Sequence, residues 1–401
     1  MATPRPVLVV NAGSSSLKYQ VLDAASGVTR ASGVVEEIGG PGRLTHTAAG
    51  ETHRREVVCA DHTEALDAAR EALREHGPDL ATLGLVAVGH RVVHGGPRFT
   101  EPVVVDDEVV AAIRELVPLA PLHNPANLAG ILSARVTFPD LPQVAVFDTA
   151  FHQSLPPQAH TYAVPLEWRE RHQVRRWGFH GTSHRFVSRR TAELLGRSPE
   201  DCNVIVLHLG NGASACAVRG GRSIDTSMGV SPLEGLVMGT RSGDVDPALG
   251  AYLQRVAGVD PAAYDDALNK ASGLKGLAGV SDLREVEERR AAGDADAALA
   301  FDVMVYRLRK YVGAYAVALG RVDAIAFTGG IGENSSEVRH AVLTGLEALG
   351  VELDPLANVE GGPERLVTTP ASRIAAFVVP TNEELEIARA CLAVLGQDGR
   401  V

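Results

Sequence analysis

Short apolar runs alternate along this chain with longer segments in which apolar residues recur every three or four positions. The short runs predict strands at residues 7–10, 17–22, 83–88, 143–147, 204–209, 324–327 and 374–379. The longer segments predict helices at residues 106–117, 125–135, 183–195, 296–319 and 335–349, one that starts at 246–247, and a closing helix after Thr381. Strands that alternate with helices are typical of α/β domains, whose ligands bind at strand ends.

Two segments of the chain share one pattern. Residues 7–14 (VLVVNAGS) and 204–211 (VIVLHLGN) both consist of an apolar strand, a polar residue, an apolar residue, a glycine and a small polar residue. In both, a second strand-like segment follows the glycine-containing loop, which predicts a tight hairpin. A match this short can also arise by chance. We interpret it as a duplication that gives two related α/β domains, the first ending near residue 150, whose two hairpins could hold a phosphate chain between them.

Composition removes several classes of function. The 401 residues include 38 Lys and Arg against 49 Asp and Glu, a net charge of 38 − 49 = −11, which argues against nucleic-acid binding. No apolar span approaches the ~20 residues of a membrane helix, and the first ten residues lack a signal peptide's apolar core, so we expect a cytoplasmic protein. The four cysteines form no Cys-x-x-Cys pair, so we expect buried, reduced thiols.

Three glycine-containing loops are candidates for phosphate binding. The first hairpin carries Asn11, three serines and Lys18, which suit phosphate oxygens, although a polar hairpin without function has the same composition. The second loop, residues 210–215, fits the dinucleotide fingerprint G-x-G-x-x-A, but a strand rather than a helix is predicted to follow it, which argues against an NAD enzyme. The third, residues 329–334, lies between a strand and a helix. The chain contains no P-loop motif.

Charged and imidazole side chains lie beside several of these glycines. Arg91 and Arg241 suit an anionic substrate, and surface ion pairs are the alternative. His180 and His184 are four residues apart without a third zinc ligand, so His180 suits better as a hydrogen-bond donor to a phosphoryl group. Asp148 ends a strand, where a carboxylate can hold a metal, orient a basic side chain or cap a turn. Residues 381–384 (TNEE) fit a capping box, in which Glu384 bonds the amide of Thr381; Glu383 is then free for a cation.

These segments together resemble a known family. Residues 11–18 (NAGSSSLK) and 178–184 (GFHGTSH) are similar to the two signature segments of the acetate kinases. Residues 90–96, 147–152, 208–214, 238–247, 328–335 and 381–384 resemble the remaining family motifs, in the same order and over nearly the whole chain. The resemblance implies an α/β fold of two duplicated ribonuclease-H-like (actin-like ATPase) domains with an interdomain cleft. The first domain would comprise residues 1–150 and a C-terminal helix, 385–401, and the nucleotide-binding domain residues 151–384.

The resemblance also assigns residues to roles. Mg²⁺ or Mn²⁺ would be held by Asn11 and Glu383. ATP or ADP would be bound by Lys18, His208, Leu209, Gly210, Asn211, Gly212, Asp282, Leu283, Arg284, Gly330, Ile331, Gly332, Glu333 and Asn334. The carboxylate substrate would be bound by Arg91, Val93, Leu122, Phe179 and Pro232. Catalysis would fall to Asp148, His180, Arg241 and Arg91, with Asp148 as acid/base and the others binding substrate or stabilising the transition state.

The activity implied is the reversible, in-line transfer of a phosphoryl group from ATP to acetate, in a homodimer that binds neither nucleic acid nor membrane. Propionate differs from acetate by one methylene, worth only ~1–3 kcal/mol in an apolar pocket, so a propionate kinase is the near alternative. An actin-like nucleotide switch is a more distant one. A carboxylate acceptor is already ionised at neutral pH and needs no general base. We therefore expect Asp148 to orient an arginine or a magnesium-bound water.

Overall fold

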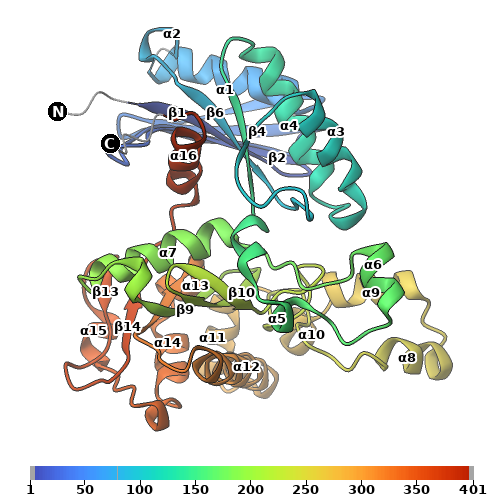
Figure 1. Ribbon diagram of the computed structural model, residues 1–401, viewed down its shortest axis with the longest axis vertical. Helices are drawn as coiled ribbons and strands as arrows, with labels where there is room; N and C mark the ends of the chain where they lie inside the picture. Colours follow the sequence, from blue (N-terminus) through green and yellow to red (C-terminus); the bar gives the residue numbers. More distant parts are fainter. Residues whose placement is uncertain (1–4, 79, 397–401) are drawn as a thin grey trace. The chain divides into compact units, whose positions relative to one another are not determined.

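The computed structural model describes residues 5–78 and 80–396. They form two compact units. The first comprises the described residues up to Phe151 together with those from Asn382 onward, and the second comprises His152–Thr381. Residues 382–384, which we predicted with the second domain, therefore lie in the first unit. Each unit contains one mixed β-sheet with helices packed on it (Figure 1).

The sheet of the first unit has eight strands in the order β5-β4-β3-β2-β1-β6-β8-β7. Strand β1 pairs antiparallel with β2 and parallel with β6, which in turn pairs parallel with β8. The strands are β1 (Pro6–Ala12), β2 (Ser16–Asp23), β3 (Thr29–Glu36), β4 (Gly40–Ala48), β5 (Glu51–Cys59), β6 (Ala87–Val92), β7 (Val103–Val104) and β8 (Gln143–Phe147). Sequence analysis missed β3–β5 because their alternate residues are solvent-exposed, so no continuous apolar run marks them.

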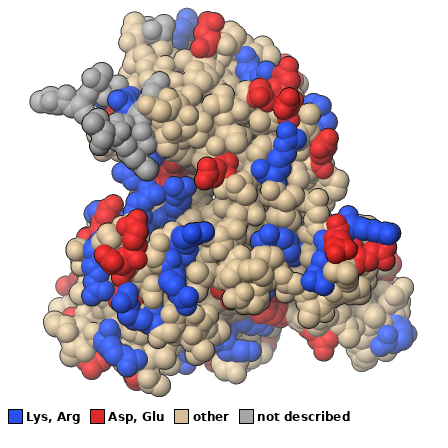
Figure 2. Space-filling model, viewed as in Figure 1, with Lys and Arg blue, Asp and Glu red and all other residues tan. Residues whose placement is uncertain are grey.

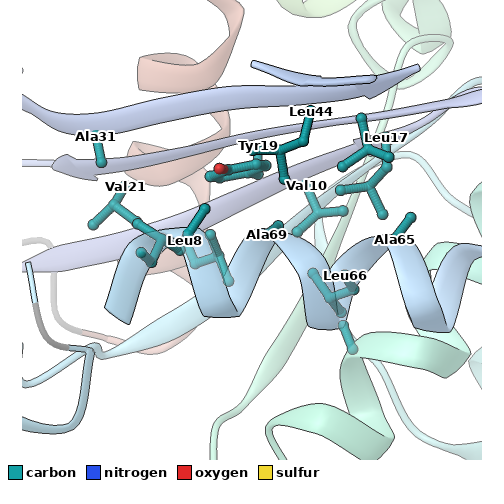
Figure 3. Packing of buried hydrophobic residues seen from close by; sticks show 14 of the residues in the cluster. Leu8, Val10, Leu17, Tyr19, Val21, Ala31, Leu44, Ala65, Leu66 and Ala69 are labelled. Carbon is teal, nitrogen blue, oxygen red and sulfur yellow. The ribbon is translucent and has the colours of Figure 1, made fainter. Parts of the chain in front are cut away.

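Helices cover both faces of this sheet. They are α1 (His62–His76), α2 (Leu80–Leu83), α3 (Asp107–Glu115), α4 (Asn124–Thr137) and α16 (Glu383–Val394). On one face, Leu8 and Val10 of β1 pack with Leu66 of α1 in a large apolar core (Figure 3). On the other face, α16 approaches β6 so closely that a Cβ at Gly89 would lie 2.7 Å from Ile387. Glycine at this position therefore lets the closing helix contact the sheet.

The second unit repeats the pairing of the first. Its sheet has the order β11-β10-β9-β12-β14-β13, and β9 pairs antiparallel with β10 and parallel with β12, which pairs parallel with β14. The strands are β9 (Asn203–Leu209), β10 (Ala213–Arg219), β11 (Arg222–Thr226), β12 (Ala324–Thr328), β13 (Arg365–Leu366) and β14 (Ala375–Val378). The run β3-β2-β1-β6-β8 thus corresponds strand for strand to β11-β10-β9-β12-β14, which confirms the predicted duplication.

The helices of the second unit were predicted only in part: those at 183–195, 296–319 and 335–349 and the one starting at 246–247 occur with shifted ends, and the others were missed. The helices of this unit are α5 (Pro157–His160), α6 (Leu166–His172), α7 (Gly181–Leu194), α8 (Leu249–Ala257), α9 (Pro261–Lys270), α10 (Gly273–Ala278), α11 (Leu283–Ala291), α12 (Ala295–Leu319), α13 (Gly329–Asn334), α14 (Ser336–Leu343) and α15 (Pro355–Val359). Helix α7 begins at Gly181, two residues before the predicted start, and its N-cap is His180. The Ser183 hydroxyl, inside the first turn, bonds His208 and Thr381. Helix α12 begins at Ala295, one residue before the predicted start, and Asp294 caps it.

The predicted capping box at residues 381–384 is wrong. Helix α16 is capped by Asn382, whose Oδ1 accepts from the amide of Leu385 at 2.9 Å. The amide of Thr381 instead donates to Glu333 Oε1 at 3.3 Å, within the second unit. Asparagine is as good an N-cap as threonine, and here it stands one position closer to the helix.

The surface carries charges of both signs (Figure 2), and the cysteines lie inside the protein. Acidic and basic side chains are interspersed on the face shown in Figure 2. All four cysteines are buried free thiols, as predicted. In the described part of the chain, none of the helices combines the length and apolar character that crossing a membrane requires.

Candidate active site

The first hairpin presents two polar side chains at its end. Asn11 on β1 and Lys18 on β2 are direct cross-strand partners, so their side chains share one face of the sheet. Both residues, together with Glu384, line a cavity of about 340 Å³. The turn between them is closed by the Gly13 amide, which donates to the Ser16 carbonyl at 2.7 Å. The hairpin therefore brings an amide and an ammonium group to one place.

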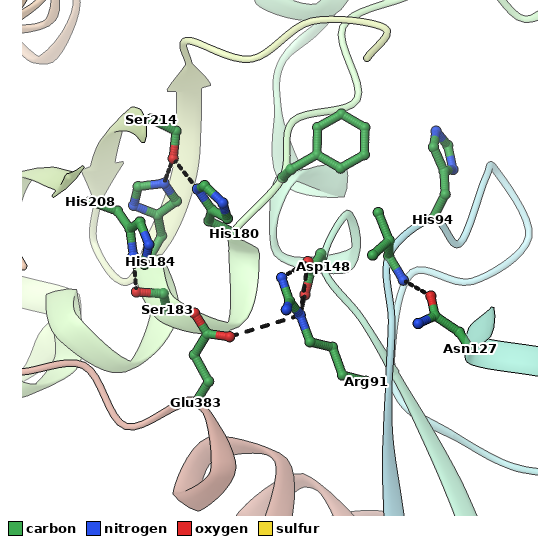
Figure 4. Close-up of polar contacts among 12 residues, drawn as sticks. Arg91, His94, Asn127, Asp148, His180, Ser183, His184, His208, Ser214 and Glu383 are labelled. Carbon is green, nitrogen blue, oxygen red and sulfur yellow. Dashed lines mark hydrogen bonds and ion pairs between the residues drawn. The ribbon is translucent and has the colours of Figure 1, made fainter. Parts of the chain in front are cut away.

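A buried ion pair lies at the end of the neighbouring strands. Arg91 on β6 donates from Nε and Nη2 to both carboxylate oxygens of Asp148, at 2.7–3.2 Å (Figure 4). Asp148 follows β8 and its side chain is 2% exposed, whereas 22% of the Arg91 side chain is exposed. Glu383 Oε2, at the start of α16, lies 3.8 Å from Arg91 Nε. The guanidinium is thus held on one edge by Asp148 and remains partly accessible.

The electrostatics of this trio follow from burial and charge. Burial alone would lower the pKa of Arg91, but the charges of Asp148 and Glu383 outweigh it and raise that pKa. Burial raises the pKa of Glu383, and the charges of Arg91 and Lys18 oppose this rise. Arg91 therefore stays protonated, and a second cation beside Glu383 would favour its charged form.

Two asparagines of α4 fix the chain that follows Arg91. Asn127 Oδ1 accepts from the amide of Val93 at 3.0 Å, and its Nδ2 donates to the carbonyl of Ala12 at 2.7 Å (Figure 4). Asn124 bonds both the amide and the carbonyl of His94, each at 3.1 Å. Asn127 thus links the first hairpin to the strand end at Val93. The role of these two asparagines could not be predicted, because a helical asparagine carries no sign of its distant partners.

In the second unit, the corresponding hairpin contacts the start of α7. His208 on β9 and Ser214 on β10 are cross-strand partners. Ser214 Oγ lies 2.9 Å from His180 Nδ1 and 2.8 Å from His184 Nε2. Ser183 Oγ lies 2.8 Å from His208 Nδ1, and the rings of His180 and His208 are 4.3 Å apart (Figure 4). These contacts give His184 a hydrogen-bonding role.

Arg241 and His180 lie beside the same glycine. A Cβ at Gly212 would lie 3.6 Å from Arg241 Nη1 and 3.8 Å from His180 Nε2. Arg241 Nη1 also donates to the carbonyl of Pro232 at 3.3 Å. Burial lowers the pKa of Arg241 from its very high usual value. A guanidinium and an imidazole therefore meet at a backbone with no side chain, which leaves room for an anion.

The loop that carries Pro232 is held by a polar network. Arg176 Nη1 donates to the carbonyls of Thr226, Ser227 and Met228 at 2.9–3.2 Å. Nη2 of the same residue donates to Glu234 Oε1 at 2.5 Å. Tyr162 also donates to Glu234. The sequence did not indicate a site role for these residues. The position of Arg176 just before the motif at 178–184 was the one feature that could have drawn attention to it.

The predicted nucleotide segments of the second unit come together in part. Leu209, Gly210 and Ile331 line one small cavity of about 10 Å³. Asn211 packs against the backbone at Gly239, where a Cβ would lie 1.8 Å from its Oδ1. Residues 329–334, predicted as a loop, form the short helix α13, and the Glu333 carboxylate accepts from the amides of Gly329 and Thr381.

The remaining predicted residues are those of segment 282–284 and of the predicted substrate pocket. Asp282 caps α11 and forms an exposed ion pair with Arg284, whose hydrogen bonds lower the pKa of Asp282 to about 2. Leu283 is buried. Leu122 is 64% exposed and belongs to the first unit with Val93. Phe179 is buried in the second unit, where its carbonyl lies 2.9 Å from His152 Nε2. The predicted pocket of Val93, Leu122, Phe179 and Pro232 draws on both units and stays a prediction.

The donor set suits a magnesium ion bound largely through its substrate. Among the described residues, no group of three or more His, Cys, Asp or Glu side chains could hold a metal. Asn11 and Glu383 offer one amide oxygen and one carboxylate, and both lie near Lys18. Magnesium commonly binds one or two protein carboxylates and keeps its other positions for water and phosphates. The residues present therefore fit Mg²⁺ that arrives with a nucleotide.

Comparison with known proteins gives similarity over nearly the whole chain. The family model described as "Acetokinase family" matches residues 6–389. A protein named acetate kinase from Streptomyces griseus is 56% identical over 402 aligned residues, which cover 99% of this chain and 98% of that protein. The crystal structure of Porphyromonas gingivalis acetate kinase is 43% identical, with a TM-score of 0.93, over 98% of this chain and 100% of that one. The structure of a propionate kinase from Francisella tularensis is 40% identical, with a TM-score of 0.91, over 96% and 98% of the two chains.

Proposed function

Because this chain belongs to the acetokinase family, we propose that it transfers the γ-phosphoryl group of ATP reversibly to the carboxylate of acetate, giving acetyl phosphate and ADP. The observation that carries this proposal is the Arg91 guanidinium. Two nitrogens on one edge of this guanidinium, Nε and Nη2, donate to Asp148, and the Arg91 side chain stays 22% exposed. A fixed, forked donor of this kind suits a small carboxylate.

The proposed transfer needs no proton. A carboxylate oxygen of acetate attacks the γ-phosphorus, a new P–O bond forms, and the bond from the γ-phosphorus to the β,γ-bridging oxygen breaks. The electron pair of that bond leaves with ADP. Acetate is ionised at neutral pH, so no general base is required. We assign Asp148 to orienting Arg91, in keeping with its bidentate contact to that guanidinium.

Stabilisation of the transferring group falls to His180 and Arg241. Charge on the three equatorial oxygens of the phosphoryl group must be neutralised in the transition state. His180 Nε2 and Arg241 Nη1 both lie close to Gly212, so their donors converge on one small volume. We assign the nucleotide to Lys18 and to the segments 208–212, 282–284 and 330–334, and Mg²⁺ to Asn11 and Glu383. When bound, the ion would neutralise phosphate charge.

Propionate is the second candidate acceptor. A solved relative with 40% identity is named a propionate kinase. One methylene changes binding by only ~1–3 kcal/mol, so both acids are expected to react. We propose acetate as the preferred substrate, and rates measured with both acids in one reaction would decide between them.

We further propose that the active protein is a homodimer. Tyr252 and Val256 of α8 and Leu166 and Trp168 of α6 are large apolar side chains that are more than half exposed in the single chain. A second copy could cover such side chains. Light scattering after gel filtration should give twice the mass of the 42.2 kDa chain. A single-chain mass at micromolar concentration would contradict the dimer.

The proposed activity is tested by trapping its product. Hydroxylamine converts an acyl phosphate to a coloured hydroxamate, so the purified protein is incubated with ATP, Mg²⁺ and acetate. We expect a signal that requires acetate and that falls at least a hundredfold in the Arg91→Ala variant. ATP hydrolysis without any acetate-dependent signal would refute the kinase and favour the nucleotide-switch alternative.

A further inference from the structure

Two histidines of the second unit meet at a single hydroxyl. Ser214 Oγ lies between His180 Nδ1, at 2.9 Å, and His184 Nε2, at 2.8 Å (Figure 4). Ser214 and His184 are completely buried. A serine hydroxyl carries one hydrogen, so it donates to one imidazole and accepts from the other. The direction of these two bonds therefore decides which ring nitrogen of His180 carries a hydrogen.

His184 settles this direction. Its Nδ1 is buried and has no hydrogen-bond partner among the described residues. Burial, followed by the nearby His152 and His208, keeps the pKa of His184 well below its usual value, so the ring is neutral and has one hydrogen. Nδ1 lacks a partner in either tautomer, but a buried N–H without an acceptor is rarer in folded proteins than an acceptor without a donor. The hydrogen therefore belongs on Nε2, which donates it to Ser214.

We propose that Ser214 and His184 are positioning residues that hold His180 as its Nε2–H tautomer. With Ser214 accepting from His184, its own hydrogen is donated to His180 Nδ1. The hydrogen of His180 is then on Nε2, the nitrogen that lies near Gly212 and Arg241. This inference rests on the proposed function, in which that nitrogen faces phosphoryl oxygens. The opposite direction would present a lone pair to the same oxygens and repel them.

The backbone of His180 supports the same arrangement independently. His180 has φ = 56°, in the left-handed region that non-glycine residues rarely occupy. The preceding residue is anchored by His152, which contacts the Phe179 carbonyl at 2.9 Å and Ser223 Oγ at 2.8 Å. Strained backbone persists where the surroundings enforce it. Here the enforced turn directs the His180 ring at Ser214.

Neutron diffraction of wild-type crystals grown in heavy water tests the inference directly. We expect deuterium on Nε2 of both His180 and His184, with the Ser214 deuterium directed at His180 Nδ1. Deuterium on His180 Nδ1 would overturn the proposal. This measurement does not depend on turnover: an enzyme that makes no acetyl phosphate refutes the proposed function, whereas a reversed hydrogen-bond direction refutes only the positioning role.

Steady-state kinetics test whether the hydrogen bonds from His184 to Ser214 and from Ser214 to His180 affect turnover. Ser214→Ala should lower kcat about tenfold and leave both KM values within twofold, since a typical net hydrogen bond accounts for a factor of this size. Ser214→Thr keeps the hydroxyl and should restore most of kcat. Ser188→Ala makes the same serine-to-alanine change in α7, at a hydroxyl that donates to the Arg185 carbonyl, and should leave kcat unchanged. Equal kcat for Ser214→Ala and wild type would overturn the proposal.

A second pair of variants covers the case in which Ser214→Ala fails to fold. His184→Gln can donate an amide N–H to Ser214, whereas His184→Leu cannot donate. We expect the glutamine variant to keep more than a third of wild-type kcat and the leucine variant to lose about tenfold. Equal losses in the two variants would indicate a purely structural role and overturn the inference.

Discussion

Asp148→Asn separates two roles that a carboxylate can have beside a substrate. Asparagine has the shape of aspartate, but one of its two oxygens becomes an NH₂ group. That group would face a donor nitrogen of Arg91, because Asp148 accepts from both Nε and Nη2. At least one of the three hydrogen bonds between Arg91 and Asp148 must therefore break, while the size of the side chain stays the same.

The size of the effect follows from the surroundings of Arg91. A hydrogen bond to a charged group contributes about 1.5–3 kcal/mol, and removing one partner of a buried ion pair costs about 3–5 kcal/mol. Glu383 lies 3.8 Å from Arg91 and keeps part of its charge balanced, so we expect about 2–3 kcal/mol. At about 1.4 kcal/mol per tenfold, this is a loss of roughly 30- to 150-fold in kcat/KM for acetate. A guanidinium displaced by an ångström gives a loss of similar size.

The assay is initial rate against acetate between pH 6 and pH 9. If Asp148 only orients Arg91, the pH–rate profile of the variant keeps the wild-type shape at a lower height. Loss of one titrating limb would refute this reasoning and make Asp148 a proton-transfer group. Asp107→Asn is the matched control: Asp107 pairs with Arg135 at 2.8 Å but is 93% exposed. An exposed pair contributes at most about 1 kcal/mol, so kcat/KM should not change.

Three further predictions follow from other contacts. Burial lowers the pKa of His90 to about 4, against 6.5 in the unfolded chain, so between pH 6.5 and pH 4 the imidazole is protonated in the unfolded state only. His90 should therefore make the free energy of unfolding about 2 kcal/mol lower at pH 5 than at pH 7.5. Denaturant unfolding of His90→Gln should show a smaller drop between these two pH values. Gly239→Ala places a methyl group 1.8 Å from the starting position of Asn211 Oδ1 and should raise KM for ATP about tenfold, whereas Gly313→Ala, which meets no neighbour, should leave it unchanged. Asn127→Leu leaves two backbone groups unpaired and should cost about 3 kcal/mol in urea unfolding, and a loss below 1 kcal/mol would contradict this.

The sequence predicted the parts of the fold that local pattern determines. Continuous apolar runs mark buried strands, so β1, β2, β8, β9 and β12 were found near their true bounds. The strands β3–β5 escaped because one of their faces meets solvent, and their alternation is broken by glycine and charged residues. Helix starts were misplaced by one to three residues, since several hydroxyl and carboxylate side chains near each start could serve as the cap. Which one caps depends on tertiary partners, as with Ser183.

For the candidate site, the sequence indicated residues but not their partners. Arg91 and Asp148 are 57 positions apart, and nothing between them predicts a bidentate contact. Ser214 was indicated as the last residue of the motif at 208–214, but nothing in the sequence showed that its hydroxyl contacts two histidines. Motif resemblance indicates candidate residues for the site. The spacing of the motifs does not show which of these residues orient one another, and only the folded chain brings such partners together.

The duplicated hairpins explain why the repeat was visible while its chemistry was not. Asn11 and Lys18 end the first hairpin as cross-strand partners, and His208 and Ser214 occupy the matching pair in the second. The apolar residues of both hairpins pack in a sheet core and must remain apolar, so the pattern is the same in both. The polar pairs are not part of the apolar core, so their residue types can differ between the two hairpins. In the first unit the Lys18 ammonium group lines a cavity, and in the second the Ser214 hydroxyl is buried between two imidazoles. One architecture thus places an ammonium group at one hairpin and a buried hydroxyl at the other.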